Sequence, residues 1–199
     1  MCWNATISLN TYFLGVFASL LALSNQVITF PVFLFYQSWI TMQLFEALVW
    51  KKTFSNELVS KWMFALILLQ PLASLYSMKE HKELKKKLMI GYLLFLSVTF
   101  TMIRPISTID FRSEKSESNG HLAWHWLDFP IIAFVVWMGF LMARFVIEKD
   151  YIVISLAMIS ALVTYLLYHK TKTWGSLWCW LINVTSFYLL YLIFKKSMC

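Results

Sequence analysis

The sequence predicts an all-α, polytopic integral membrane protein: a single transmembrane domain, residues 1–199, folded as a bundle of about seven helices. Hydrophobic residues make up 60% of the chain and aromatic residues 18%, whereas only 14% are charged. Ordinary globular domains carry about 25% charged residues, so this chain has too much apolar surface for one soluble core. The apolar residues also occur in seven runs, separated by charged or turn-forming breaks, and each run is nearly long enough to cross a bilayer. Six spans is the alternative.

The charged residues gather in short clusters between the apolar runs. There are 17 Lys and Arg against 10 Asp and Glu, which gives a formal charge of +7. Because the clusters flank apolar runs, we expect the lipid bilayer as a partner and no nucleic acid. Cys2, Cys179 and Cys199 show no paired spacing, so no disulfide framework, zinc site or cofactor is expected. No Lys or Arg precedes Lys51, so the first run lacks the basic start of a cleaved signal peptide and is expected to be retained.

The seven runs predict seven helical spans. They cover about 7–24, 32–50, 60–78, 88–103, 129–147, 151–168 and 176–194. Asn25 and Pro31 supply turn chemistry before the second span, and Lys51 ends that span as an interfacial cation. In the third span, Pro71 removes a backbone donor and frees a carbonyl one turn back, so a kink is predicted, with Gln70 bonding the freed group.

One long polar connection, residues 104–127, separates the fourth and fifth runs. Its stretch 113–120 is rich in Ser, Glu and Lys and is typical of a solvated loop. Counting basic residues on alternate sides of seven spans gives nine against eight, which decides little. The densest cluster, 79–87, lies in a short connection, where the positive-inside rule has most weight. We therefore favour an N-terminus outside and a C-terminus inside.

The second span carries a carboxylate, Glu46, in the middle of an apolar run. A charged side chain in hydrocarbon costs roughly 2.5–3.5 kcal/mol on insertion scales, so Glu46 is expected to face the bundle interior. Gln43 lies on the same stripe of the helix, and polar residues of other spans could bond to it. The predicted intramembrane polar cluster consists of Glu46, Gln43, Gln70 and Asn183. Arg104 or Arg144, each at another helix end, is the candidate compensating charge.

Aromatic and histidine residues at two places predict an interfacial cap. Its predicted members are His121, Trp124, His125, Trp126, Trp178 and Trp180, because indole and imidazole rings favour the bilayer boundary. The i, i+4 spacing of His121 and His125 would also put two imidazoles on one helical face, with Asp128 nearby, as a metal site needs. No further ligand pair with recognisable spacing exists, so we expect a cap without a metal.

Several short motifs, spread over nearly the whole chain, resemble a known family. They are Met1-Cys2-Trp3-Asn4-Ala5, Ser8-Leu9-Asn10-Thr11, Met42-Gln43-Leu44-Phe45-Glu46, Gln70-Pro71-Leu72-Ala73-Ser74, Asn119-Gly120-His121-Leu122 with Trp124 and Trp126, and Trp178-Cys179-Trp180 with Asn183. The combination is similar to a family of small uncharacterised polytopic membrane proteins encoded by giant DNA viruses. The resemblance implies a viral context, and it carries over no catalytic or binding residue.

Three classes of function remain open from the sequence. In a transport or channel-like protein, Glu46 and its cluster would form a polar path between helices. In a structural or partner-binding membrane protein, the same polar groups would only lock the helices together. An integral-membrane metal-dependent enzyme using His121, His125 and Asp128 or Glu46 ranks last, and the catalytic residues of such an enzyme are unknown. Substrate, protein partners and oligomeric state cannot be read from the sequence.

Overall fold

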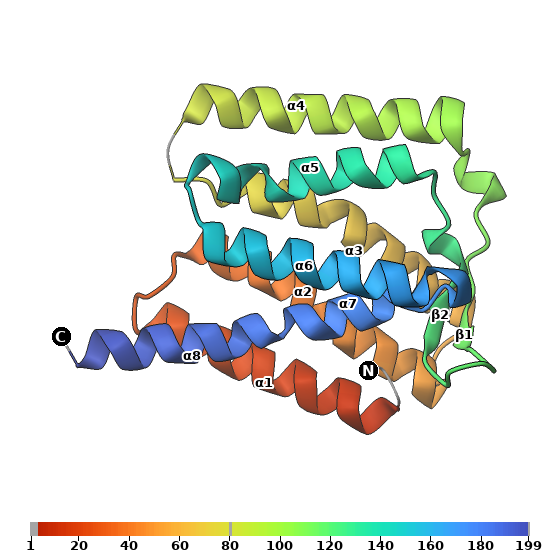
Figure 1. The fold of residues 1–199 in the computed structure, drawn as a ribbon, viewed down its shortest axis with the longest axis horizontal. Helices are drawn as coiled ribbons and strands as arrows, with labels where there is room; N and C mark the ends of the chain where they lie inside the picture. The colour runs from red at the N-terminus through yellow and green to blue at the C-terminus, as the bar shows by residue number, and fades with distance from the viewer. Residues whose placement is uncertain (1–3, 80, 199) are drawn as a thin grey trace.

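The protein is a bundle of roughly parallel and antiparallel helices, capped at one end by a small β-hairpin (Figure 1). The computed structural model describes residues 4–79 and 81–198. The helices are α1 (Ala5–Ser24), α2 (Phe30–Lys51), α3 (Asn56–Tyr76), α4 (Lys82–Val98), α5 (Ile131–Ile147), α6 (Tyr151–Tyr168), α7 (Trp174–Ile182) and α8 (Val184–Ser197). Short turns of other helix types cover Thr99–Ile103, Ile106–Thr108, His125–Leu127 and His169–Thr171.

Capping side chains begin several of these helices. The Asn4 side chain accepts from the backbone N–H of Ile7 at 2.9 Å at the start of α1. Ser55 caps α3 and Asp150 caps α6 in the same way. Such caps satisfy backbone donors that have no partner inside the helix, so each fixes a helix start.

The predicted all-α fold is confirmed, and six helical stretches are long and apolar enough to cross a membrane. They are Ala5–Ser24, Phe30–Lys51, Asn56–Tyr76, Lys82–Ile103, Tyr151–Thr171 and Trp174–Ser197. Helix α5 is also apolar but shorter, with 17 residues. The last predicted run is not one continuous helix, because the helix is interrupted at Asn183 between α7 and α8.

Helices α2 and α3 lie at the centre of the bundle. Helix α2 packs against α1, α3 and α7, while α3 packs against α2, α4 and α5. Helix α6 packs between α5 and α7, and α8 returns beside α1 (Figure 1). Helix α4 lies at the outer edge, and of its residues, all of which are described, only Tyr92 is buried.

Small residues bring α1 close to α2. A Cβ atom on Gly15 would lie 2.8 Å from Ile40, so only glycine fits there without a shift. One turn further along α1, the Ser19 hydroxyl accepts a hydrogen bond from Gln37 Nε2 at 2.7 Å. Close backbone approach with an interhelical hydrogen bond is typical of helix pairs in membranes.

The connection 104–127, of which the sequence predicted 113–120 to be a solvated loop, also holds regular structure. It contains a two-stranded antiparallel hairpin of β1 (Ser113–Lys115) and β2 (Leu122–Trp124), in which Ser113 pairs with Trp124. All three residues of β2 are buried, because the hairpin lies over the ends of α3 and α7. Residues 116–118, at the tip of the hairpin, remain at the surface. The prediction of a solvated loop therefore holds only for this tip.

The two ends of the bundle differ in chemistry. At the hairpin end, the hairpin is bonded to the start of α3 and to the connection between α6 and α7. At the opposite end, Lys79 N–H donates to Glu148 at 2.9 Å and Lys196 Nζ to the Asn25 carbonyl at 2.8 Å. We call this the basic end, because it carries the lysines of 79–87 and the C-terminal pair. The start of α1 and the end of α8 lie at different ends (Figure 1).

Candidate functional site: an apolar cavity at the hairpin end

Pro71 in α3 determines how the neighbouring helices attach. A proline has no N–H, so the carbonyl of Ile67, one turn back, loses its helical donor. Trp137 of α5 supplies a replacement, since its Nε1 donates to this carbonyl at 3.3 Å. Tyr92 of α4 donates to the next carbonyl, that of Leu68, at 2.7 Å. Both hydrogen bonds stabilise the proline-containing helix by tying it to α4 and α5.

Gln70 does not bond the freed backbone, so that part of the sequence prediction is wrong. Its Nε2 instead donates to the Ser38 carbonyl of α2 at 3.2 Å. The reason is directional: Gln70 points toward α2, whereas the carbonyl freed by Pro71 points toward α5. The indole of Trp137 was the donor that sequence reasoning missed.

An apolar cavity of about 200 Å³ adjoins these contacts. Side chains of α3, α4, α5, α6 and α7, together with the hairpin, form its wall. Aromatic rings dominate the wall, among them Phe64, Phe95, Phe100, Phe134, Trp137 and Trp178. Ile131 also lines the cavity and is 54% exposed, so the cavity reaches the surface of the bundle beside the start of α5.

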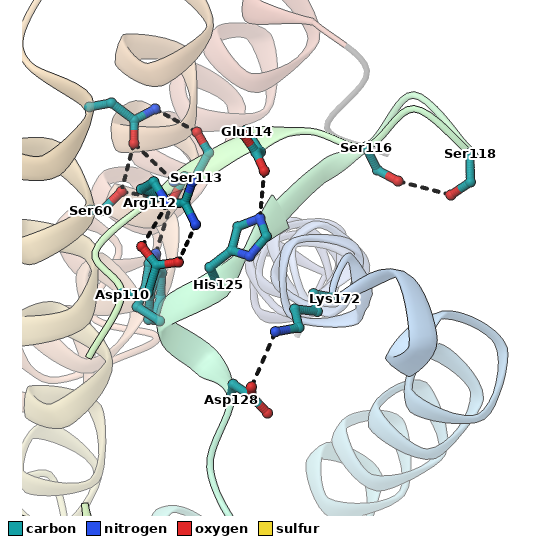
Figure 2. Close-up of polar contacts among 12 residues, drawn as sticks. Ser60, Asp110, Arg112, Ser113, Glu114, Ser116, Ser118, His125, Asp128 and Lys172 are labelled. Carbon is teal, nitrogen blue, oxygen red and sulfur yellow. Dashed lines mark hydrogen bonds and ion pairs between the residues drawn. The ribbon is translucent and has the colours of Figure 1, made fainter. Parts of the chain in front are cut away.

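A polar rim borders the cavity where it meets the hairpin end. Lys172 Nζ and Asp128 Oδ2 form an ion pair at 3.1 Å, and both residues line the cavity (Figure 2). His169 lines it too, and its Nδ1 lies 3.0 Å from the Tyr165 carbonyl. The Arg104 guanidinium lies 5.3 Å from the centre of the Phe129 ring, which is part of the wall. The rim therefore holds more positive than negative charge.

Two buried polar atoms belong to residues of the cavity wall. Thr99 Oγ1 and Trp124 Nε1 have no hydrogen-bond partner among the residues that the structure describes. Thr99 is 3% exposed and Trp124 1% exposed, so bulk water does not replace the missing partners. Buried polar groups are nearly always hydrogen-bonded, so these two are exceptions within the described part of the chain.

The four residues of the predicted polar cluster all lie inside the bundle. Glu46, Gln43 and Gln70 are fully buried, and Asn183 is nearly so. Asn183 Nδ2 donates within its own segment, to the Cys179 carbonyl at 2.7 Å. Cys179 in turn lies within electrostatic range of Glu46, so α2 and α7 bring these groups to one region. None of the four residues lines the apolar cavity.

The two arginines considered as partners for Glu46 have other neighbours. Arg144 is 7% exposed and lies at the basic end, where its Nε donates to Glu148 Oε2 at 3.0 Å and its Nη1 to Ser77 Oγ at 2.6 Å. Burial alone would raise the pKa of Glu148, but hydrogen bonds from the Lys79 N–H and from Arg144 lower this pKa overall. The cluster joins the ends of α3 and α5.

The residues predicted to form an interfacial cap lie in different surroundings. Trp124 and Trp126 stack in the hairpin with ring centres 4.8 Å apart, and Trp126 Nε1 donates to Ser113 Oγ at 2.9 Å. His125 Nε2 lies 2.8 Å from Glu114 Oε1 (Figure 2). His121 is buried, with its ring 6.0 Å from that of Tyr168, and burial lowers the pKa of His121.

Trp178 does not belong to this cap, although the sequence placed it there with Trp180. Trp178 is 3% exposed, and its Nε1 donates to the Ala157 carbonyl at 3.2 Å and to Ser160 Oγ at 3.1 Å in α6. It was misplaced because α7 begins beneath the hairpin, so the first turns of this helix lie inside the bundle. Trp180 is half-buried in the same helix.

The three weak metal candidates lie apart. His121 and His125 flank β2, and four residues of extended chain span about 13 Å, so their rings do not converge as they would on a helix. Asp128 is bonded to Lys172 instead. Among the described residues, no group of three His, Cys, Asp or Glu side chains is placed to hold a metal ion.

These features define a class of protein: an all-helical bundle with several helices able to cross a membrane and an apolar cavity under a hairpin cap. The chain matches no family model, no curated protein and no solved structure. The resemblance to membrane proteins of giant viruses therefore stays a prediction.

Proposed function

We propose that this protein is a seven-span integral membrane protein that takes one hydrocarbon chain from the bilayer into the cavity between α3, α4, α5 and α7. The observation that carries this proposal is the cavity itself: about 200 Å³, walled by aromatic rings and open to the surface at Ile131. Apolar cavities of this kind stay dry and bind apolar molecules. Inside a bilayer, the most abundant apolar molecules are the lipid chains that surround the bundle.

The size of the cavity favours a single chain. Sites for drug-sized ligands measure roughly 300–1,000 Å³, so this cavity is too small for both chains of a lipid. The outer position of α4, which buries only Tyr92 among its residues, supports entry from the side. Phe140 of α5 packs against Tyr92 near the middle of α4. The cavity lies further along, beside the last residues of α4 and the turn that follows it.

Seven spans form part of the proposal. Helix α5 has 17 residues and is about 26 Å long, slightly less than the roughly 30 Å hydrocarbon core. Its position between α3 and α6 supports a crossing nonetheless, because each neighbour is itself long enough to span. An odd number of spans agrees with α1 starting and α8 ending at different ends of the bundle. The basic end would face inside.

Transport along a polar path around Glu46 stays a prediction that the geometry favours less. Glu46 and Gln43 are fully buried and do not line the cavity. Gln70 and Asn183 each donate a hydrogen bond to a backbone carbonyl. The Gln70 hydrogen bond supports a role in holding α2 and α3 together.

A photoreactive alkane tests the proposal with the full chain in lipid nanodiscs. We expect the probe to label Trp137 and Trp178, which are buried wall residues, as well as exposed Leu94. Ala133→Phe, which fills the cavity, should abolish labelling of the buried pair and keep that of Leu94. Val135→Phe is the matched control, because Val135 lies on α5 but is 56% exposed and does not line the cavity. Labelling of Leu94 without Trp137 or Trp178 in the unmodified protein would overturn the proposal.

A further inference from the structure

We infer that the chain bound in this cavity ends in an anionic headgroup, which lies at the cavity mouth between Lys172 and Arg104. The inference rests on the proposed function and names the chemical class of its ligand: an amphiphile whose headgroup presents an anionic oxygen. The carboxylate of a fatty acid and the phosphate of a lipid share this chemistry. Neutral and cationic amphiphiles lack it.

Lys172 is the first support, because it lines the cavity and its side chain is 41% exposed. The backbone holds this residue against the hairpin: its N–H donates to the His169 carbonyl at 3.1 Å, and its carbonyl accepts from the Trp124 N–H at 3.0 Å. Lys172 Nζ is paired with Asp128, whose side chain is also exposed. Exposed ion pairs contribute little, so the ammonium group can exchange this carboxylate for an anionic headgroup.

Arg104 supplies a second cation from another wall of the cavity. It follows the turn Thr99–Ile103 at the end of α4, whereas Lys172 precedes α7. The guanidinium of Arg104 lies 5.3 Å from the centre of the Phe129 ring, which lines the cavity. Among the described residues, no carboxylate lies within ion-pair distance of this guanidinium. Two cations and one carboxylate, that of Asp128, therefore border the mouth, which leaves one positive charge in surplus.

Two helices that begin at the mouth add to this positive potential. Helix α5 begins at Ile131 and α7 at Trp174, and both residues line the cavity. A helix N-terminus carries a partial positive charge, which favours a nearby anion. Neither helix has a side-chain cap or an acidic residue in its first turn. An anionic headgroup at the mouth would supply the negative charge that these N-termini lack.

The position of the charges along the bundle fits a headgroup with a tail. Lys172 and Asp128 lie in connections between helices at the hairpin end (Figure 2). Leu68 and Trp137 line the cavity near the middle of α3 and α5. An amphiphile with its tail against Trp137 and its headgroup at Lys172 keeps its charge at the surface of the bilayer, so no charge enters the hydrocarbon.

Competition against the photoreactive alkane measures the headgroup preference. The competitors share a dodecyl-length chain: dodecanoate, dodecyl phosphate, dodecanol and dodecyltrimethylammonium. The readout is labelling of Trp137 in nanodiscs of zwitterionic lipid at low salt. We expect both anions to compete at concentrations about fivefold lower than dodecanol, which is the effect of one exposed charge pair, and the cation at higher concentrations. High salt should shrink this preference, because it screens exposed charges.

Variants assign the preference to the rim. Lys172→Met should remove the advantage of the anions over dodecanol, because the charges of Arg104 and Asp128 then balance. Asp128→Asn should increase that advantage. Lys170→Met is the matched control: Lys170 is exposed, lies two residues from Lys172 and does not line the cavity, so the preference should stay unchanged. Each competitor is compared with itself across the variants, which cancels differences in how it partitions into the bilayer.

The outcomes separate the two sources and the two proposals. Stronger competition by dodecyl phosphate than by dodecanoate indicates a lipid phosphate; equal or weaker competition indicates a fatty acid, and both outcomes support an anionic headgroup. If dodecanol or the cation competes as well as the anions, or if the anions keep their advantage in Lys172→Met, the cavity binds chains but the headgroup inference falls. If nothing competes and the alkane labels no buried residue, the proposed function falls instead.

Discussion

At the scale of single residues, the missing N–H of Pro71 leaves one carbonyl of α3 without its helical donor, and a side chain of α5 takes that place. The freed Ile67 carbonyl needs a donor in a region without water, and Trp137 supplies it from α5. Tyr92 supplies a second donor, to Leu68, and is the one buried residue of α4. The same two contacts form the inner boundary of the cavity, since Leu68 and Trp137 both line it. Leu68 and Trp137 therefore both attach α3 to its neighbours and shape the cavity.

His121 gives the hairpin a dependence on pH. Burial lowers the pKa of His121, so the folded protein binds this proton less tightly than the unfolded chain does. Its contribution to stability is complete above the unfolded pKa of about 6.5 and is lost as pH falls below that value. We expect the Tm of the unmodified protein to fall by a few degrees more between pH 7.5 and pH 5 than that of His121→Phe. If the difference in Tm between the unmodified protein and His121→Phe does not change with pH, the imidazole of His121 is not buried in its neutral form.

At the scale of elements, Gly175 sets how closely the hairpin packs on α7. A Cβ atom there would overlap Leu127 and lie 2.8 Å from Trp124 Cε3. Gly175→Ala should therefore destabilise the protein by about 1–3 kcal/mol, because the hairpin must move away from α7. Gly139→Ala in α5 is the control, since nothing lies within 4 Å of its Cβ position, and it should be neutral or stabilising by up to about 1 kcal/mol. Equal unfolding midpoints in denaturant for the two variants would contradict this packing.

The elements that the sequence predicts well are those with a strong local signal. Long apolar runs make helices wherever water is absent, so α1, α2, α3 and α6 begin and end within a few residues of their predicted bounds. The hairpin was missed because its strands have only three residues each, and tertiary contacts rather than alternation stabilise them. The helix interruption at Asn183 lies in an apolar run without Pro or Gly, so no helix-breaking residue predicts it.

The candidate site was less predictable than the elements. Glu46 and Gln43 stand out in the sequence because a charge is costly in hydrocarbon, and both are indeed buried. Thr99 and the rings of the cavity wall give no such signal, since aromatic residues are common in every span of this chain. A cavity arises from how five helices and a hairpin meet, which no local pattern encodes. Trp124, Asp128, Trp178 and Cys179 line the cavity and are named in the sequence analysis, but each for another reason.

At the scale of the whole molecule, the ends of the bundle predict its orientation in a membrane. The hairpin end and the basic end carry different connections and would lie on opposite sides of the membrane, and an odd number of spans puts the start of α1 and the end of α8 on opposite sides as well. Lysines dominate the basic end, where short connections would face inside. The hairpin would then face outside, and the cavity would open in the outer leaflet.

Site-directed thiol labelling tests this orientation. Ser118 at the hairpin tip and Ser197 at the end of α8 are both exposed, so either can be replaced by Cys in a background with Cys2→Ser and Cys199→Ser. Cys179 can remain because it is buried. In intact cells, a membrane-impermeant maleimide should label Ser118→Cys at once and Ser197→Cys only after lysis. Labelling of both before lysis would exclude an odd number of spans, because α5 would then fail to cross. The reverse pattern would keep seven spans and place the hairpin, with the cavity mouth, on the inner side.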